Sequence, residues 1–417
     1  MADDDRRSEL DRPPPSPAGW PEPVPPGRLV DARAKLRPVL VASYVTTGLR
    51  MARRGLLGPT RFRGDAAEIC RSVVGACWNG RYFAASGGHF RQFWTRDLAF
   101  SAPALIRLGQ RKRVLASLAW ALRIWRRAGA VTTTIFPGRR PLDVHTLGVD
   151  SLPLLLQALR DVGAERLVAA HAGWLGPAVA RWPAEVLDPA TGLVRDDRAF
   201  ATHRDVVVTR SNATANTMAA VLSGVLRETG WFPDPVPPGA AERLVDRFWR
   251  DGAFVDDPRT GVVAGDATIF PFWFRVVPDD LGLAGALARL REEGLADPLP
   301  LRYVARRDPD VEDPQASWLV PNYQGTAIWS SLGAMYLTLL GRVDPAAAEH
   351  GLAAWARRIE ADGTVWEVFD DALRPYVGRF RLFRADESML WASLFLDVLR
   401  RREPHLAESA DGPDEAR

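Results

Sequence analysis

Helical periodicity runs through nearly the whole chain, and no other feature restricts the fold as strongly. Apolar residues recur at intervals of three and four in about twelve segments, as expected for helices that bury one face. These segments are 30–53, 65–77, 97–108, 111–128, 151–162, 165–182, 213–228, 238–249, 281–293, 325–340, 345–360 and 387–401. Short β-rich pieces, such as 206–208 and 267–274, lie only in the connections. Strands and helices do not alternate, which argues against a doubly wound sheet.

The spacing of these helices predicts how they are arranged. Each helix with its connection takes about 31 residues, more than the common connections of 2–6 residues require. We therefore expect a long connection after every second helix. An α-solenoid would show short, uniform connections and a repeat of 34–47 residues, and the sequence has no such repeat. The pattern favours an all-α toroid of helical hairpins with long loops collected at one end and only short strands.

Composition changes mark the ends of the folded part. Residues 1–28 are charged and then rich in proline, so we expect a disordered tail. Residues 29–403 form one predicted domain, and residues 404–417 a polar C-terminal tail.

The charge and the cysteines restrict partners and compartment. The net charge of +3 includes one short basic run, 111–113, so we expect no nucleic-acid partner. No apolar run reaches the roughly 18 residues of a membrane helix, and Met1 is followed by acidic residues rather than by a secretory signal. Cys70 and Cys77 lie too far apart on one predicted helix to form a disulfide. We therefore expect a cytoplasmic protein with no membrane partner.

Polar and aromatic residues gather in the long connections. The chain has 15 Trp but only 6 Tyr and 6 His, and tryptophan packs in cores but also stacks on the apolar faces of sugars. Acidic, amide and aromatic residues recur in the loops 87–97, 143–151, 195–205, 265–273, 320–329 and 363–370. This composition is expected of a polar cleft with stacking faces.

Asp97, at the end of the first of these loops, has two interpretations. It can be the N-cap of the following helix, where an aspartate contributes about 1 kcal/mol. Alternatively it is a carboxyl at the floor of a cleft, between Trp94, which could stack on a sugar ring, and Arg96, which could hold a hydroxyl or a charge.

Four sequence elements resemble those of a known group of enzymes. Residues 93–97, Phe-Trp-Thr-Arg-Asp, are similar to the W-x-R-D element of the six-hairpin (α/α)6-barrel glycosidases. This group includes glucoamylases, trehalases, the glucosidase I and mannosylglycerate hydrolase family, and the neutral/alkaline invertases. Residues 148–155, 323–329 and 366–370 resemble three further elements, in the family order. The resemblance implies that 29–403 is an (α/α)6 catalytic domain.

The resemblance also implies roles for individual residues. Asp97 would be the general acid that protonates the leaving oxygen, and Glu367 the general base that activates water. Such an inverting pair has its carboxyls about 6.5–9.5 Å apart. The residues expected to bind the sugar are Trp94, Arg96, Asp150, Gln324, Trp329 and Trp366. Asp370 and Asp371 adjoin Glu367, so the assignment of the base is open by one turn, and Phe369 stands where tyrosine is usual.

The resulting prediction is an inverting, exo-acting glycoside hydrolase that cleaves an α-linked, glucoside-type sugar from a small carbohydrate or glycoside. It requires no cofactor, and no metal-ligand spacing is present. Arginines in the loops (Arg81, Arg91, Arg96, Arg204 and Arg210) leave an anionic aglycone open. The alternatives are a sugar epimerase or polysaccharide lyase on the same toroid, in which His203 or His145 would face Asp97 in place of Glu367, or a non-catalytic carbohydrate-binding protein.

Overall fold

The structure, a computed structural model, describes residues 38–144, 146–309 and 311–402. The predicted tails 1–28 and 404–417, and His145, lie outside these ranges.

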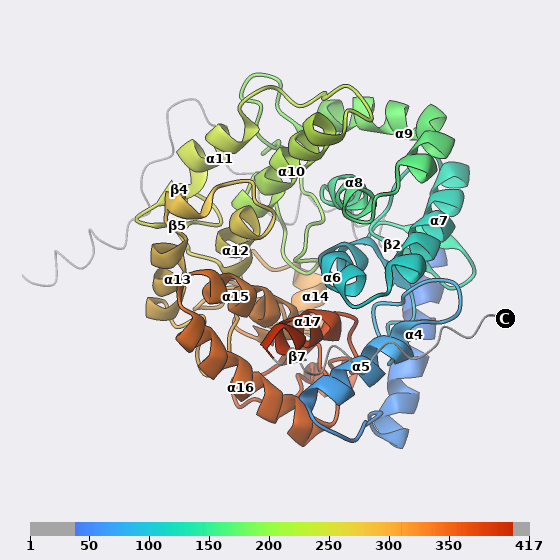
Figure 1. The fold of residues 1–417 in the computed structure, drawn as a ribbon, viewed down its shortest axis with the longest axis vertical. Coiled ribbons are helices and arrows are strands. Elements are labelled where there is room, and N and C mark those ends of the chain that lie inside the picture. Colours follow the sequence, from blue (N-terminus) through green and yellow to red (C-terminus); the bar gives the residue numbers. More distant parts are fainter. Residues whose placement is uncertain (1–37, 145, 310, 403–417) are drawn as a thin grey trace, which may run out of the picture.

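Six helices form a closed inner ring (Figure 1). Each packs against the next in chain order, and the last packs against the first. They are α6 (Thr95–Arg107), α8 (Ser151–Asp161), α10 (Ala213–Thr229), α12 (Gly265–Trp273), α15 (Ser330–Val343) and α17 (Ala392–Arg402). Most residues of these helices are buried, because each one touches two ring neighbours and an outer helix.

Outer helices surround this ring (Figure 1). Each packs on at least one inner helix: α5 (Ala66–Cys77) covers α17 and α7 (Arg111–Ala128) covers α6, whereas α13 (Leu283–Glu292) contacts both α12 and α15. The outer helices are α5 (Ala66–Cys77), α7 (Arg111–Ala128), α9 (Glu165–Val186), α11 (Ala240–Phe248), α13 (Leu283–Glu292) and α16 (Pro345–Asp362). The predicted (α/α)6 toroid of helical hairpins is therefore confirmed.

The remaining elements are short or lie outside the two rings. They are α4 (Pro38–Leu57), α14 (Pro314–Leu319) and the 3₁₀ turns η1 (Asp279–Leu281) and η2 (Arg379–Arg381). The strands are β1 (Phe93–Trp94), β2 (Thr134–Phe136), β3 (Arg140–Leu142), β4 (Trp249–Arg250), β5 (Ala253–Phe254), β6 (Ile328–Trp329) and β7 (Val368–Phe369). All pairings between them are antiparallel. Strands β1 and β6 lead directly into the inner helices α6 and α15, which fixes where those helices begin.

Several local predictions were wrong, for reasons that the packing explains. The segment 267–274 was expected to be β-rich, but most of it belongs to helix α12, which is buried on nearly all sides and so lacks a polar face. The segment 206–208 forms a turn with an isolated bridge from Val207 to Glu312 rather than a strand. The helix expected from 325 begins at Ser330, because β6 pairs with β7 just before it.

Side-chain caps account for other helix starts. Asp65 and Glu68 form a reciprocal capping box at the start of α5. Asn212 accepts a hydrogen bond from the Ala215 amide at 2.8 Å, and Asp344 accepts one from the Ala347 amide at 3.0 Å. In the described part of the chain, no helix combines the length and apolar character needed to cross a membrane.

Candidate active site

A cavity of about 520 Å³ lies at the N-terminal ends of the inner helices α6, α15 and α17. Its volume falls in the range of about 300–1,000 Å³ that is common for small-molecule sites. Six of the residues predicted from the sequence line it: Trp94, Arg96, Asp97, Gln324, Trp329 and Glu367. Asp150 and Trp366 are not among the residues that line the cavity.

Asp97 lies in the first turn of α6 and is not the N-cap. The helix begins at Thr95, and Trp94, the last residue of β1, occupies the N-cap position. The side chain of Asp97 is half-buried and faces the cavity. Burial raises the pKa of this carboxyl to about 7, although the neighbouring Arg96 guanidinium favours ionisation. Asp97 can therefore carry a proton near neutral pH.

Arg96 joins two aspartates from different loops. Its Nε donates to Asp150 Oδ2 and its Nη1 to Asp205 Oδ1, both at 2.6 Å. Asp150 occupies the N-cap position of α8 but makes no cap hydrogen bond, and its carboxylate contacts Arg96 instead. Nη2 of Arg96 is buried without a hydrogen-bond partner in the protein. Asp150 thus holds the Arg96 side chain, which lines the cavity, and does not line the cavity itself.

Glu367 lies immediately before β7 and is almost fully buried. Its Oε1 accepts a hydrogen bond from the Tyr323 hydroxyl, and its Oε2 accepts one from the Asp386 amide at 3.1 Å. Burial raises the pKa of Glu367 to about 8, and the hydrogen bond from Tyr323 opposes that shift. The negative charges of Asp386 and Asp97 raise this pKa further. The two predicted catalytic carboxyls therefore share one cavity and interact electrostatically.

Asp370 and Asp371, which left the assignment of the base open, do not line the cavity. Asp370 accepts hydrogen bonds from Arg374, and the exposed Asp371 pairs with Arg302. Of these neighbouring acids, only Glu367 faces the space that Asp97 faces.

Two further residues of the cavity had no role assigned from the sequence. Asp205 is half-buried and ion-paired with Arg96, and burial raises its pKa. Tyr323 contacts Glu367 directly. Asp205 ends the acidic loop 195–205, and Tyr323 opens the element 323–329, so both lie in segments that the sequence singled out. Nothing in the spacing showed that loop 195–205 folds back onto Arg96.

The other predicted residues mainly hold loops in place. The Gln324 side chain accepts from the Val206 amide at 2.7 Å and donates to the His203 carbonyl at 3.2 Å. Trp329 donates from Nε1 to the Tyr323 carbonyl at 2.9 Å, and its ring contacts Tyr323 edge-on. Trp366 is half-buried, and its carbonyl accepts from Ser330 Oγ at 2.6 Å.

His203 is the one histidine that lines the cavity within the described ranges. Its Nδ1 lies 2.7 Å from the Tyr303 hydroxyl, and its ring packs edge-on against Phe100. Burial, with help from the Arg96 and Arg204 charges, holds its pKa well below the usual value. His203 is therefore a neutral, hydrogen-bonded ring.

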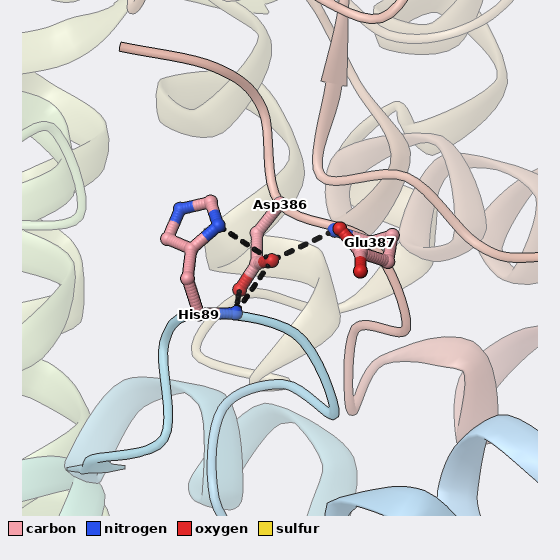
Figure 2. A group of neighbouring side chains, drawn as sticks. All are labelled: His89, Asp386 and Glu387. Carbon is pink, nitrogen blue, oxygen red and sulfur yellow. Dashed lines mark hydrogen bonds and ion pairs between the residues drawn. The ribbon is translucent and has the colours of Figure 1, made fainter. Parts of the chain in front are cut away.

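A buried junction supports the loop behind Glu367. Figure 2 shows the ring of His89 facing the carboxylate of Asp386, with Nδ1 2.8 Å from Oδ1. Asp386 also accepts from Ser86 Oγ and from the amides of His89, Phe90 and Glu387. His89, Asp386 and Glu387 lie close enough together to ligate a cation, but Asp386 is already saturated with donors and Glu387 pairs with Arg54. The described contacts fit a structural link between loop 86–90 and the segment that bonds Glu367.

Comparison with known proteins identifies solved structures of similar fold. The sequence matches no protein-family model, and no curated protein matches it. A wild-type glycosidase structure superposes with a TM-score of 0.56 at 17% identity, covering 81% of this chain and 96% of that chain. A glycosidase variant in complex with glucose gives a TM-score of 0.56 at 16% identity, with the same coverage of each chain.

The GH63 mannosylglycerate hydrolase from Thermus thermophilus, in complex with Tris and D-glycerate, has a TM-score of 0.53 at 16% identity. The match covers 80% of this chain and 100% of that chain. At these identities the likeness concerns the fold. The chain is thus similar in fold to these glycosidases, one of which is a GH63 enzyme, and has the (α/α)6 architecture that its sequence motifs predicted.

Proposed function

We propose that the protein is an inverting, exo-acting glycoside hydrolase for an α-linked, glucoside-type sugar. The observation that carries the proposal is that the carboxyls of Asp97 and Glu367 line one cavity. Burial raises the pKa of Asp97 to about 7, which suits an acid, whereas burial also raises the pKa of Glu367, so that Glu367 serves as a base only in its ionised form. A carboxyl that stays protonated near neutral pH can act as a general acid, and a second carboxyl facing the same space can act as a base. This chemistry needs no cofactor.

In the proposed reaction, the two carboxyls work on opposite faces of the sugar. Asp97 gives its proton to the glycosidic oxygen as the bond from that oxygen to the anomeric carbon breaks. Glu367 takes a proton from the water that attacks the same carbon. The products are the free sugar and the alcohol of the aglycone, and the two carboxyls return to their starting states by exchanging protons with solvent. The hydrogen bonds from Tyr323 and the Asp386 amide favour the ionised form of Glu367 that this role requires.

Residues around the pair supply the contacts for the sugar. Trp94 and Trp329 offer aromatic faces in the cavity. Arg96 Nη2 and Gln92 Oε1 are buried without protein partners in a cavity that both residues line, so they suit sugar hydroxyls. We also assign sugar binding to Gln324. Asp150 holds the Arg96 side chain, and Trp366 acts through the backbone next to Glu367.

Asp205 is the competing candidate for the acid, because it lines the cavity and also has a raised pKa. Unlike Asp97, it is held by a direct hydrogen bond from Arg96. Removing each carboxyl separately distinguishes the two aspartates.

The test uses α- and β-linked disaccharides together with glycosyl glycerates, since the structural neighbours bind glucose or D-glycerate. Wild type should release a monosaccharide from an α-linked member. Asp97→Asn and Glu367→Gln should each lower kcat by at least about 10²-fold, and Asp205→Asn by less. A larger loss in Asp205→Asn than in Asp97→Asn would move the acid to Asp205, and full activity in Glu367→Gln would refute the pair.

A further inference from the structure

We propose that the leaving group of the substrate is apolar, an alkyl or aryl aglycone that occupies the mouth of the cavity. This inference rests on the proposed function, in which the floor of the cavity binds the sugar. It differs from the anionic aglycone that the loop arginines left open.

The residues that line the cavity differ widely in exposure. Arg96, Gln324 and Glu367 line it and are each less than a twentieth exposed, so they form its floor. Leu382 lines the same cavity but is 61% exposed, so it lies at the mouth. A leucine in that position offers an apolar contact to whatever leaves the floor towards solvent.

Other apolar side chains line the cavity as well. Met51 from α4, Leu319 from α14 and Phe383 line the cavity together with Leu382. They come from three parts of the chain that lie far apart in sequence, so the apolar mouth is formed by the fold and is not the accident of one loop. A hydroxylated or charged aglycone that lay against these four side chains would lose hydration without gaining hydrogen-bond partners from them.

The apolar surface continues outside the mouth. Trp318 is 56% exposed and lies in α14, next to Leu319. Its ring centroid is 5.4 Å from that of Phe380, which is 70% exposed and lies two residues before Leu382. Exposed apolar side chains that cluster beside a cavity are typical of ligand-binding grooves. They give an extended aglycone a surface on which to lie.

The charges of the cavity argue against an anionic aglycone. Among the described residues, Arg96 is the only cationic side chain that lines it, and two aspartates already neutralise it. Four acidic residues line the same space: Asp97, Asp205, Asp313 and Glu367. The other loop arginines, Arg81, Arg91, Arg204 and Arg210, do not line the cavity. A carboxylate or phosphate on the aglycone would therefore face acidic residues without a free cation.

The test is a series of methyl, butyl and octyl α-glucosides and α-mannosides, used below the concentrations at which they form micelles, with the matching α-glycosyl glycerates. We expect kcat/KM to rise by about fourfold for each methylene that the mouth buries. The glycosyl glycerates should be poorer substrates than the butyl glycosides. A rate independent of chain length, or a preference for glycerates, would overturn the inference.

Leu382→Ser and Leu56→Ser form a matched pair of variants. Both leucines are exposed, but Leu56, in α4, does not line the cavity. Leu382→Ser should lower the ratio of octyl to methyl kcat/KM by at least about threefold, and Leu56→Ser should leave that ratio at the wild-type value. Equal ratios in all three proteins would contradict a role for Leu382 and hence the assignment of the mouth.

Binding of octyl and methyl α-thioglucosides, followed by calorimetry, separates this inference from the proposed function. Tighter binding of the octyl compound, with no glycoside hydrolysed, would support the apolar mouth and count against the hydrolase. Hydrolysis of glycosides, with equal binding of both thioglucosides, would support the hydrolase and count against the apolar mouth.

Discussion

Tyr323 donates a hydrogen bond to Glu367 at the floor of the cavity. The phenol is buried, and its own pKa lies well above the usual value because of that burial and the nearby carboxyl, so it remains a donor. Edge-on contacts with Trp329 and Phe383 fix its ring. The hydrogen bond favours the ionised form of Glu367, whereas burial opposes it. Tyr323 thus favours ionisation of Glu367, the residue that we propose as the base.

The first prediction concerns Tyr323→Phe. Removing a hydrogen bond to a charged group costs about 1.5–3 kcal/mol, so the pKa of Glu367 should rise by about one to two units. Because the base must be ionised, the acidic limb of the pH profile of kcat/KM should move to higher pH. Tyr376→Phe is the matched control, since its hydroxyl donates to the Pro321 carbonyl outside the cavity. An acidic limb at the wild-type pH in Tyr323→Phe would contradict this role.

The second prediction concerns the cost of ionising the two carboxyls in the fold. Their pKa values are raised from 3.8 and 4.5 to about 7 for Asp97 and about 8 for Glu367, chiefly by burial. The folded state therefore holds protons that the unfolded state releases, and its stability falls as the pH rises from about 4 to 8. We compare the free energy of unfolding of Asp97→Asn and of Glu367→Gln with that of wild type. For each variant, the difference from wild type should shift in favour of the variant by at least about 1 kcal/mol from pH 5 to pH 8.5. Denaturant unfolding at the two pH values measures this shift. If variant and wild type differ in free energy of unfolding by the same amount at both pH values, neither pKa is raised.

The third prediction tests the junction behind Glu367. Asp386→Ala leaves the buried Ser86 hydroxyl and the amides of His89 and Phe90 without their acceptor. We expect a loss of about 3 kcal/mol in the free energy of unfolding. Asp371→Ala, which removes an exposed carboxylate paired with Arg302, should cost less than about 1 kcal/mol. Similar costs for the two variants would show that the junction does not stabilise the fold.

The fourth prediction concerns Arg96→Lys. A lysine has one ammonium and cannot hold Asp150 and Asp205 at the same time as the planar guanidinium does. One buried aspartate then loses its partner, so kcat/KM should fall by at least about tenfold. Arg107→Lys is the control, because Arg107 makes a two-pronged pair with Asp397 away from the cavity. Steady-state kinetics measure kcat/KM for both variants. Equal kcat/KM values for Arg96→Lys and Arg107→Lys would exclude a role for the Arg96 bridge.

The sequence predicted the amphipathic helices well and the buried ones less well. Segment 111–128 coincides with α7, since an outer helix keeps a polar face that shows its period. Helix α12 is apolar on nearly every side, so it looked like a strand. Helix α15 begins later than predicted because the short strand β6 precedes it and pairs with β7. A pairing of two residues with a distant segment leaves no local pattern in the sequence.

In the site, too, the sequence predicted which residues are neighbours along the chain but not which distant residues make contact. Motifs placed Trp94, Arg96 and Asp97 together because they are adjacent in the chain. The contact between Arg96 and Asp205 joins residues 109 positions apart, and that between Tyr323 and Glu367 joins residues 44 positions apart. Such contacts depend on how the inner helices close into a ring, which no single loop encodes.

The most direct test of the proposed mechanism is the configuration of the sugar at the moment of release. Proton NMR of an α-glycoside mixed with the enzyme resolves the anomeric signals before mutarotation equalises them. We expect the β-anomer to appear first and Glu367→Gln to abolish its release. Initial release of the α-anomer would show retention of configuration and would contradict the role of Glu367 as a base acting on water.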